Sequence, residues 1–352
     1  MNNNIVRSTK HTTMDDSFKK EDIFDLDPFH HHLHMSVTDW FKTILFGMFL
    51  IPFRIVIMLL FAIIMHIISS TALILTSNVV DDKKEDATRV PGFGSRMAIR
   101  LITLLGRLCF RIIGFRVMIK GNIATQKQAP ILVFAPHSTF FDFLISFWCC
   151  TFTYPFVSPP YAVSAIENTD IPFMGNLLKL IGSINVCRED SNSRKKTIKE
   201  INRRSKLTEG NSSYQWPQLI ISPEGHHSNR KAILPFKLGA FYPGKPIQPI
   251  IVSYPNQIDT VTWTLKQNHG AIAVLFVTLA QWRTNVQLEF LPVYNPKSHE
   301  VENPTLYAKF VRNIMARALE TPLSDVDFSE AKKEFAKPSD NRPTLHRKGL
   351  YQ

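Results

Sequence analysis

The stretch 131–143, "ILVFAPHSTFFDF", joins five apolar residues to a polar loop that carries a histidine and an aspartate. We interpret "ILVFA" as a buried strand, because a short continuous apolar run is typical of a strand covered on both faces. His137 and Asp142 are five positions apart, and on one continuous helix their side chains would point ~140° away from each other. The two can therefore meet only if His137 lies on a loop and Asp142 lies in the first turn of a helix that begins near Phe140.

The spacing of this pair is not specific by itself. His11/Asp16 and His34/Asp39 have the same separation, but they lie in a polar region with no strand before them. Only the pair in 131–143 follows an apolar run that would hold both side chains rigidly. Two interpretations remain open from these residues: a catalytic pair, or a helix-start aspartate favoured by the helix dipole beside a polar residue at a strand end.

The composition indicates a basic chain with anionic partners. Its 352 residues suffice for one sizeable domain with appendages or for two small domains, and the formal net charge is +12. Phospholipid surfaces, phosphorylated cofactors and nucleic acid are the partners that this charge favours. No nucleic-acid-binding motif is found, and a long apolar segment argues against that class. The four cysteines show no C-x-x-C spacing, so we interpret them as reduced packing residues.

The N-terminal quarter predicts attachment to a membrane. Residues 1–38 are polar, and we expect a disordered tail apart from "FDLDPFHHHLH", whose histidines form a solvated patch or, alternatively, bind a metal. Residues 39–77 are expected to form the anchor, because the part after Arg54 is long enough to cross a hydrocarbon core of ~30 Å. Pro52 interrupts the segment, so a spanning helix and a hairpin within one leaflet both remain open, with the hairpin slightly favoured. We expect the Arg54 side chain to extend to the lipid headgroups.

Residues 78–115 are expected to form a charged linker followed by a basic amphipathic helix. "IRLITLLGRLCFRIIGF", residues 99–115, places three arginines among apolar residues, as in helices that lie on a membrane surface. Packing on the following domain is the alternative. A second apolar stretch, 271–282, is interpreted as core, with an acyl-chain tunnel or insertion into the membrane as the alternatives.

Residues 116–330 show the alternation of an α/β domain, and residues 331–352 are expected to form a C-terminal tail. Helices are predicted at 172–181, 191–207 and 304–319, the last with Asn303 as its cap and Pro304 in its first turn. The expected strands are "FRVMI", "ILVFA", "YAVSA", "SINVC", "QLIIS", "IQPIIVS" and "VQLEFLPVY". Strands that alternate with helices favour an α/β fold, with helices layered on an at least partly parallel sheet.

Three more stretches place polar residues at the ends of expected strands. "GSINVCRED" carries Arg188, "LIISPEGHHSNR" carries Glu224 and Gly225, and "FKLGAFYPGKPIQPIIVSYPN" carries Lys237 beside a strand bracketed by prolines. Loops that follow the strands of an open α/β sheet are where such folds place their sites. These residues are therefore candidates for one site with His137.

Taken together, the four blocks resemble the glycerolipid acyltransferases. His137-x4-Asp142, Gly182 to Arg188, Pro223-Glu224-Gly225 and "PIQPI" occur in the order of that family's motifs, and "FKLGAFYPGKPIQPIIVSYPNQIDTVTWTL" is similar to lysophosphatidylcholine acyltransferases. The resemblance covers roughly residues 40–330. It implies a layered mixed sheet flanked by helices, acyl-CoA and a lysophospholipid as substrates, and no cofactor or metal. It also implies the endoplasmic reticulum membrane, with the site facing the cytosol.

The same resemblance implies a role for each candidate residue. His137 would act as the base that takes the proton of the lysophospholipid hydroxyl, and Asp142 would orient and stabilise its ring. Arg188 would bind the phosphate of the acceptor, with Lys237 as a weaker second contact. The third block would contribute to the acceptor site through its glutamate and through the close backbone approach that its glycine permits.

Two departures from the family pattern leave alternatives open. His226 stands where the family usually has threonine after Glu-Gly, and no calcium-binding helix-loop-helix follows, so calcium regulation through such modules is not expected. The acceptor could instead be lysophosphatidic acid or an ether-linked lysolipid. A catalytically inactive membrane-binding homologue and a metal-dependent lipid hydrolase are the remaining alternatives, although no H-x-H or H-E-x-x-H spacing is present.

Overall fold

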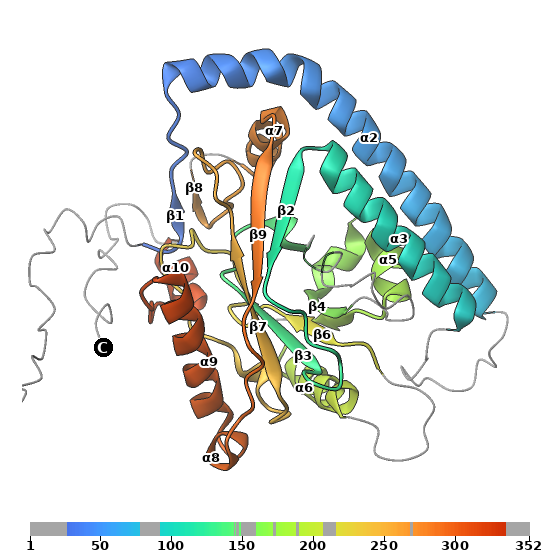
Figure 1. The fold of residues 1–352 in the computed structure, drawn as a ribbon, viewed down its shortest axis with the longest axis vertical. Helices are drawn as coiled ribbons and strands as arrows, with labels where there is room; N and C mark the ends of the chain where they lie inside the picture. The colour runs from blue at the N-terminus through green and yellow to red at the C-terminus, as the bar shows by residue number, and fades with distance from the viewer. Residues whose placement is uncertain are drawn as a thin grey trace, which may run out of the picture.

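A seven-stranded sheet with helices on both faces forms the centre of the molecule (Figure 1). The structure is a computed structural model, and the residues that it describes are 27–77, 92–143, 145, 148, 160–171, 174–187, 190–206, 216–267 and 270–335. All structural statements below concern these residues.

The sheet is mixed, as expected. Its strand order is β2-β9-β7-β3-β6-β4-β5, and each neighbouring pair is parallel except β7 and β9, which are antiparallel. The strands are β2 (Phe115–Lys120), β3 (Ile131–Ala135), β4 (Tyr161–Ala165), β5 (Ile184–Val186), β6 (Leu219–Ile221), β7 (Ile247–Ser253) and β9 (Thr284–Phe290). Because β6 and β7 both run parallel to β3, the loops that follow these three strands leave the sheet at the same edge.

Strand β3 lies at the centre of the sheet, which explains its uninterrupted apolar sequence. Ile131, Val133 and Ala135 pack into the core on one face, and Leu132 packs into the core on the other face. The helices on the first face include α6 (Ser191–Ser205) and α9 (Pro304–Leu319). A strand with both faces covered needs apolar residues at every position rather than at alternate ones.

The start of helix α9 follows the predicted cap signals. The Asn303 side chain accepts a hydrogen bond from the Leu306 N–H (3.2 Å) and caps α9, with Pro304 in the first turn. Asp190 caps α6 in the same way. Other helices in the described residues, besides α2 below, are α3 (Phe93–Ile112), η2 (Phe140–Phe143), η3 (Ile166–Asp170), α5 (Met174–Leu180), η4 (Leu238–Ala240), α7 (Ala271–Ala280), α8 (Ser298–Val301) and α10 (Phe328–Phe335).

The apolar N-terminal segment forms one helix, α2 (Val37–Ser77), instead of the hairpin that Pro52 favoured. A proline removes one backbone hydrogen bond but does not end a helix that is held by packing on either side of it. Among the described residues, α2 is the helix that is long and apolar enough to cross a membrane. Figure 1 shows α2 running over α7 and alongside α3.

Arg54 joins α2 to the domain, which corrects the expectation that its side chain extends to lipid headgroups. The guanidinium is buried and donates to the carbonyl oxygens of Leu279 (2.7 Å), Gln281 (2.5 Å) and Trp282 (3.1 Å). The last carbonyls of a helix have no partner within the helix, so a cation at the end of α7 satisfies them.

The amphipathic helix α3 packs on the domain and also keeps an apolar outer face. Ile99, Ile102 and Phe110 are buried, whereas Leu101 and Leu104 are exposed. Helix α7 divides in the same way, because Val274 and Leu279 are buried and Ile272 and Phe276 are exposed. Neither helix is therefore simply a core helix or simply a surface helix.

The segment before α2 is attached to the domain. Phe29 is fully buried against Leu234 and Ala331, and the Asn229 side chain donates to two of the segment's carbonyl oxygens. Strand β1 (His30–His31) pairs with β8 (Lys266–Gln267). Within the expected histidine patch, His32 and His34 are exposed, but His31 packs against the domain.

Candidate active site

His137 and Asp142 lie at the carboxyl edge of the sheet and contact each other. Strand β3 ends at Ala135, His137 follows on the loop, and Asp142 lies in the short helix η2. This is the placement that allows two side chains five positions apart to meet. The His137 Nδ1 atom is 2.7 Å from Asp142 Oδ2, so the ring donates its Nδ1 proton to the carboxylate. The His137 side chain keeps 19% of its surface exposed, whereas that of Asp142 has none.

Asp142 is held by four donors. Its Oδ2 atom accepts from His137 and from the backbone N–H groups of Ser138 (2.8 Å) and Thr139 (3.2 Å), and its Oδ1 atom accepts from the Tyr254 hydroxyl (2.5 Å). Burial by itself would raise the pKa of Asp142, but the hydrogen bonds from His137, Tyr254 and Ser138 hold it below its usual value. The carboxylate is therefore ionised and cannot rotate without losing a donor.

Glu224 fixes the backbone of the His137 loop. Its side chain is buried, and its two oxygens accept the backbone N–H groups of His137 (2.6 Å) and Leu234 (2.9 Å). Burial raises the pKa of Glu224 to about 8, although the two N–H groups act in the opposite direction. These two hydrogen bonds clamp the His137 loop to the chain at Leu234, and the expected contribution of Glu224 to the acceptor site stays a prediction.

Gly225 and Lys237 lie side by side next to this clamp. Gly225 has a φ of +70°, a left-handed conformation that favours glycine, and an added Cβ atom would lie 3.9 Å from the Lys237 side chain. The Lys237 backbone N–H donates to the Pro223 carbonyl oxygen, and its ammonium lies 2.5 Å from Asp327. Partial burial would raise the pKa of Asp327, but the hydrogen bond from Lys237 lowers it to about 2.

Arg188 lies outside the described residues, so its expected contact with the acceptor phosphate stays a prediction. The strand before it, β5, is separated from β3 by β6 and β4. Three strand spacings correspond to ~14 Å, so the ends of β5 and β3 belong to the same edge of the sheet but not to one tight cluster.

The two histidines after Gly225 take different positions. The His227 ring centroid is 4.2 Å from that of His137, whereas the His226 ring stacks on Phe328 at 3.7 Å. His226, the position at which the sequence departs from the expected motif, therefore lies against α10, and His227 lies beside the candidate base.

Two residues of the site were not predicted: Arg230 and Tyr254. Tyr254 is the first residue after β7, which neighbours β3, so its position at a strand end was the available signal. Nothing in the sequence pattern indicates that the Arg230 guanidinium reaches the Ser138 hydroxyl (2.8 Å).

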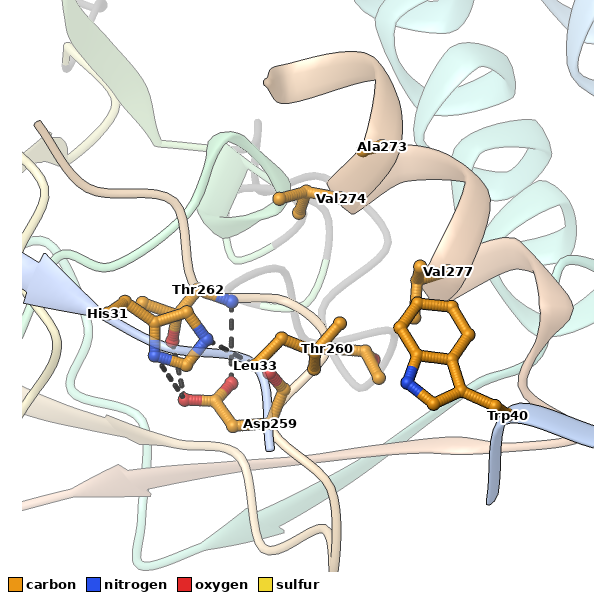
Figure 2. Close-up of a pocket in the computed structure, with 9 residues that line it drawn as sticks. All are labelled: His31, Leu33, Trp40, Asp259, Thr260, Thr262, Ala273, Val274 and Val277. Atoms are coloured by element: carbon orange, nitrogen blue, oxygen red, sulfur yellow. Dashed lines mark hydrogen bonds and ion pairs between the residues drawn. The ribbon is translucent and has the colours of Figure 1, made fainter. Parts of the chain in front are cut away.

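A cavity of about 60 Å³ lies near this site but does not include His137 or Asp142. Figure 2 shows it between helix α7, the segment before α2, and the loop that carries Asp259 and Thr262. The lining is mostly apolar, with Trp40 and Val277 on one side and a polar corner at His31 and Asp259. Among the described residues, no group of three or more histidine, cysteine, aspartate or glutamate side chains is arranged to hold a metal ion.

Comparisons with known proteins indicate the family of this domain. Residues 116–253 match the family model described as Acyltransferase. These residues belong to the acyltransferase family. The chain is 37% identical to lysophosphatidylcholine acyltransferase 2 of Danio rerio over 88% of this chain and 55% of that protein. It is also 37% identical to the lysophospholipid acyltransferase LPCAT4 of Homo sapiens over 86% of this chain and 54% of that protein.

The acyltransferase chain spans about half the length of these curated relatives. Among solved structures, it is similar to the 1-acyl-sn-glycerophosphate acyltransferase PlsC from Thermotoga maritima. The identity is 17%, the TM-score is 0.44, and the match covers 81% of this chain and 99% of that chain.

Proposed function

We propose that the protein transfers a fatty acyl group from acyl-CoA to the sn-2 hydroxyl of a lysophospholipid, with lysophosphatidylcholine as the favoured acceptor. The observation that carries this proposal is the hydrogen bond between His137 Nδ1 and the buried Asp142 carboxylate. With Nδ1 occupied, the Nε2 atom of the neutral ring is the one available to accept a proton. The names of the relatives support the acceptor class.

The reaction needs a base because a lipid hydroxyl is a weak nucleophile at neutral pH. His137 takes the hydroxyl proton as the oxygen attacks the thioester carbonyl, so that a C–O bond forms while the C–S bond breaks. The proton then passes from His137 to the leaving sulfur of CoA. Asp142 stabilises the imidazolium that exists between these two proton transfers, and it keeps the ring in the tautomer that accepts at Nε2.

The other candidates support this chemistry in different ways. Glu224 keeps the His137 backbone in place through the 2.6 Å hydrogen bond. Arg188 is proposed as the ligand of the acceptor phosphate, since a guanidinium can bind two phosphate oxygens at once. Lys237 can serve as a second phosphate contact only by leaving Asp327, because the two are paired in this structure.

We propose that α2 attaches the enzyme to one leaflet rather than crossing the bilayer. The helix contacts the domain near Gly47, where an added Cβ atom would lie 3.2 Å from Ala280, and again at Ser70, whose hydroxyl accepts from Asn176 (2.9 Å). A helix attached at both points cannot stand across a membrane unless the domain enters it. Large apolar side chains on the free surface of α2, α3 and α7 would face lipid, among them Phe49, Leu60, Leu104 and Phe276.

The membrane in question is proposed to be that of the endoplasmic reticulum, with the active site toward the cytosol, where acyl-CoA is available. Labelling of single cysteines tests the one-leaflet arrangement in sealed microsomes. A cysteine at Ser36, before α2, and one at Ser298, in α8, should react with a membrane-impermeant reagent from the same side. A cysteine at Ser77, where α2 ends, distinguishes the two modes, because protection of this position until the vesicles are opened would contradict the proposal.

The function is tested with purified protein in detergent, radiolabelled acyl-CoA and a set of lysophospholipids. We expect acyl transfer to lysophosphatidylcholine that persists in EDTA and is lost in His137→Ala. Transfer only to lysophosphatidic acid or to ether-linked lysolipids would identify a different acceptor. Hydrolysis of a phospholipid without acyl-CoA, or turnover by His137→Ala equal to that of the wild type, would overturn the proposal. A chain that binds acyl-CoA but transfers nothing would be an inactive homologue.

A further inference from the structure

Tyr254 makes a contact with the candidate catalytic pair that the proposed mechanism does not use. Its hydroxyl donates to Asp142 Oδ1 at 2.5 Å, and the whole residue is buried. Burial, together with the neighbouring Asp142 charge, raises the pKa of the Tyr254 phenol well above its usual value, so the phenol is neutral and donates its proton. Among the hydrogen bonds of the described residues, this is the one that reaches Oδ1.

Arg230 holds the tyrosine and the His137 loop together. Its guanidinium carbon lies 5.0 Å from the centroid of the Tyr254 ring, one nitrogen donates to the Ser138 hydroxyl (2.8 Å), and another donates to Asp259 (2.6 Å). Arg230 has a φ of +67°, a left-handed conformation that is uncommon for a residue with a side chain. The backbone therefore adopts an unfavourable conformation at the position from which the guanidinium reaches these groups.

We propose that Tyr254 and Arg230 are positioning residues for the His137–Asp142 pair. Tyr254 fixes the carboxylate so that Oδ2 faces His137, and Arg230 fixes both the Tyr254 ring and the loop residue next to His137. This inference rests on the proposed function, because it assigns residues that act through the proposed base.

The physical reason is the position of Asp142 in the protein interior. An ionised carboxylate without exposed surface needs donors on both oxygens. Oδ2 has three donors, whereas in the described structure the Oδ1 donor is Tyr254. Without the phenol, the negative charge of Asp142 loses the hydrogen bond that stabilises it at Oδ1. The carboxylate then attracts the proton on His137 Nδ1 more strongly. The base should accordingly become protonated at higher pH and be less effective at neutral pH.

Other titratable groups face this network and are the same in both tyrosine variants below. Asp259 pairs with Arg230 and lies 3.9 Å from His31. Glu224 lies behind the His137 loop, close enough for the Asp142 charge to affect its pKa, and His227 lies beside the His137 ring. Because these groups remain unchanged, a difference between two tyrosine variants reports on the phenol itself.

The test compares Tyr254→Phe with Tyr307→Phe. Tyr307 is also buried, and its hydroxyl also makes one hydrogen bond, to the Lys245 carbonyl oxygen (2.8 Å), but it lies in the core on the other face of the sheet. Each variant loses one oxygen atom and one hydrogen bond made by a buried tyrosine. In Tyr254→Phe we expect kcat to fall roughly 10-fold with KM for both substrates within about twofold. The acid limb of the kcat/KM profile should move to higher pH by about half a unit or more. In Tyr307→Phe, neither quantity should change.

Arg230→Lys provides a second variant in case Tyr254→Phe melts far below Tyr307→Phe. Lysine keeps the positive charge but cannot bridge Ser138 and Asp259 with one planar group. We expect the same direction of change in kcat and in the acid limb. An acid limb that stays at its wild-type pH in the folded variants, with kcat within twofold of wild type, would overturn the inference.

A measurement without turnover separates this inference from the proposed function. The rate at which diethyl pyrocarbonate modifies His137, followed by peptide mass spectrometry as a function of pH, reports the ionisation of that ring. A shift in Tyr254→Phe that is absent in Tyr307→Phe supports the positioning role even if the wild type transfers no acyl group. If the wild type is active and the labelling profile of Tyr254→Phe does not move, the inference is wrong while the proposed function stands.

Discussion

The Arg54 guanidinium on α2 lies 2.7 Å from the Leu279 carbonyl oxygen at the end of α7. One arginine thereby connects the apolar N-terminal helix to the body of the domain, where an apolar side chain would leave several carbonyl groups without a donor.

Replacement of Arg54 by methionine should destabilise the protein by roughly 1–3 kcal/mol, because buried carbonyl groups lose their donor. Thermal unfolding in detergent measures the loss. Arg111→Met is the matched control, since Arg111 is an exposed arginine on α3. Equal melting temperatures for the two variants would show that the contacts of Arg54 add nothing to stability.

Asp142→Asn should lower kcat by roughly 10²–10⁴-fold, because an amide cannot stabilise the imidazolium and can hold the ring in the wrong tautomer. The buried site keeps its shape in this variant, so KM for acyl-CoA should change little. Steady-state kinetics, with circular dichroism to verify folding, measure the effect. A loss of less than threefold would rule out a catalytic role for the pair.

Glu224 predicts a dependence of stability on pH. Its pKa is raised to about 8 in the folded protein, above the ordinary value of 4.5, so the folded state binds the extra proton between these values. The contribution of this protonated carboxyl group to the free energy of unfolding is fully present below pH 4.5. It is lost as the pH rises through about 8, and the loss is on the order of a few kcal/mol. Glu224→Gln stays neutral over this range, so its free energy of unfolding, measured by urea denaturation at several pH values, should change less with pH than that of the wild type. Glu302→Gln, at an exposed position, should keep the wild-type dependence on pH. The same pH dependence in both variants would contradict the expectation.

Gly225→Ala should cost roughly 1–2 kcal/mol, because a side chain disfavours the left-handed conformation at φ +70°. Space is not the cause, since the nearest atom to an added Cβ is 3.9 Å away. Gly239→Ala is the control, because its Cβ would also have room, 3.7 Å from Ile201, without a positive φ. Chemical denaturation of both variants separates conformational strain from crowding.

Lys237→Met should raise the KM for the lysophospholipid a few-fold without changing kcat, if the ammonium binds the acceptor phosphate. Asp327→Asn removes the other partner of the exposed ion pair and frees Lys237, so its KM should stay equal or fall. The ion pair itself is worth less than about 1 kcal/mol, as is typical of exposed pairs. Equal increases in KM for the two variants would indicate that only the pair matters.

The strands and the contact between His137 and Asp142 could be predicted because local patterns determine them. The apolar run at 131–135 forms β3 at the residues expected, and "IQPIIVS" forms β7 at residues 247–253. Helix geometry required Asp142 to lie in the turn after the loop if its side chain was to meet His137, and it does. These features depend on neighbours in the sequence, which the sequence displays directly.

The interactions of Arg54, Arg230 and Glu224 could not be predicted, because each depends on groups distant in the sequence. Arg54 meets carbonyls more than two hundred positions later, and Glu224 reaches the His137 backbone 87 positions earlier. The sequence shows that a charged residue lies in an apolar segment, but it does not show which distant buried carbonyl group accepts its hydrogen bond. The apolar segment containing Pro52 shows the same limit, because packing held it in one helix.

The central place of β3 also has a consequence for biosynthesis. Its neighbours β6 and β7 are made long after it, since Ile131 pairs with Leu219 and with Ile247. During translation, α2 leaves the ribosome well before β6 or β7 has been made. The apolar helix can therefore partition into lipid while β3 still lacks both neighbouring strands. The nascent chain would then complete the sheet edge that carries His137 while it is already tethered to lipid.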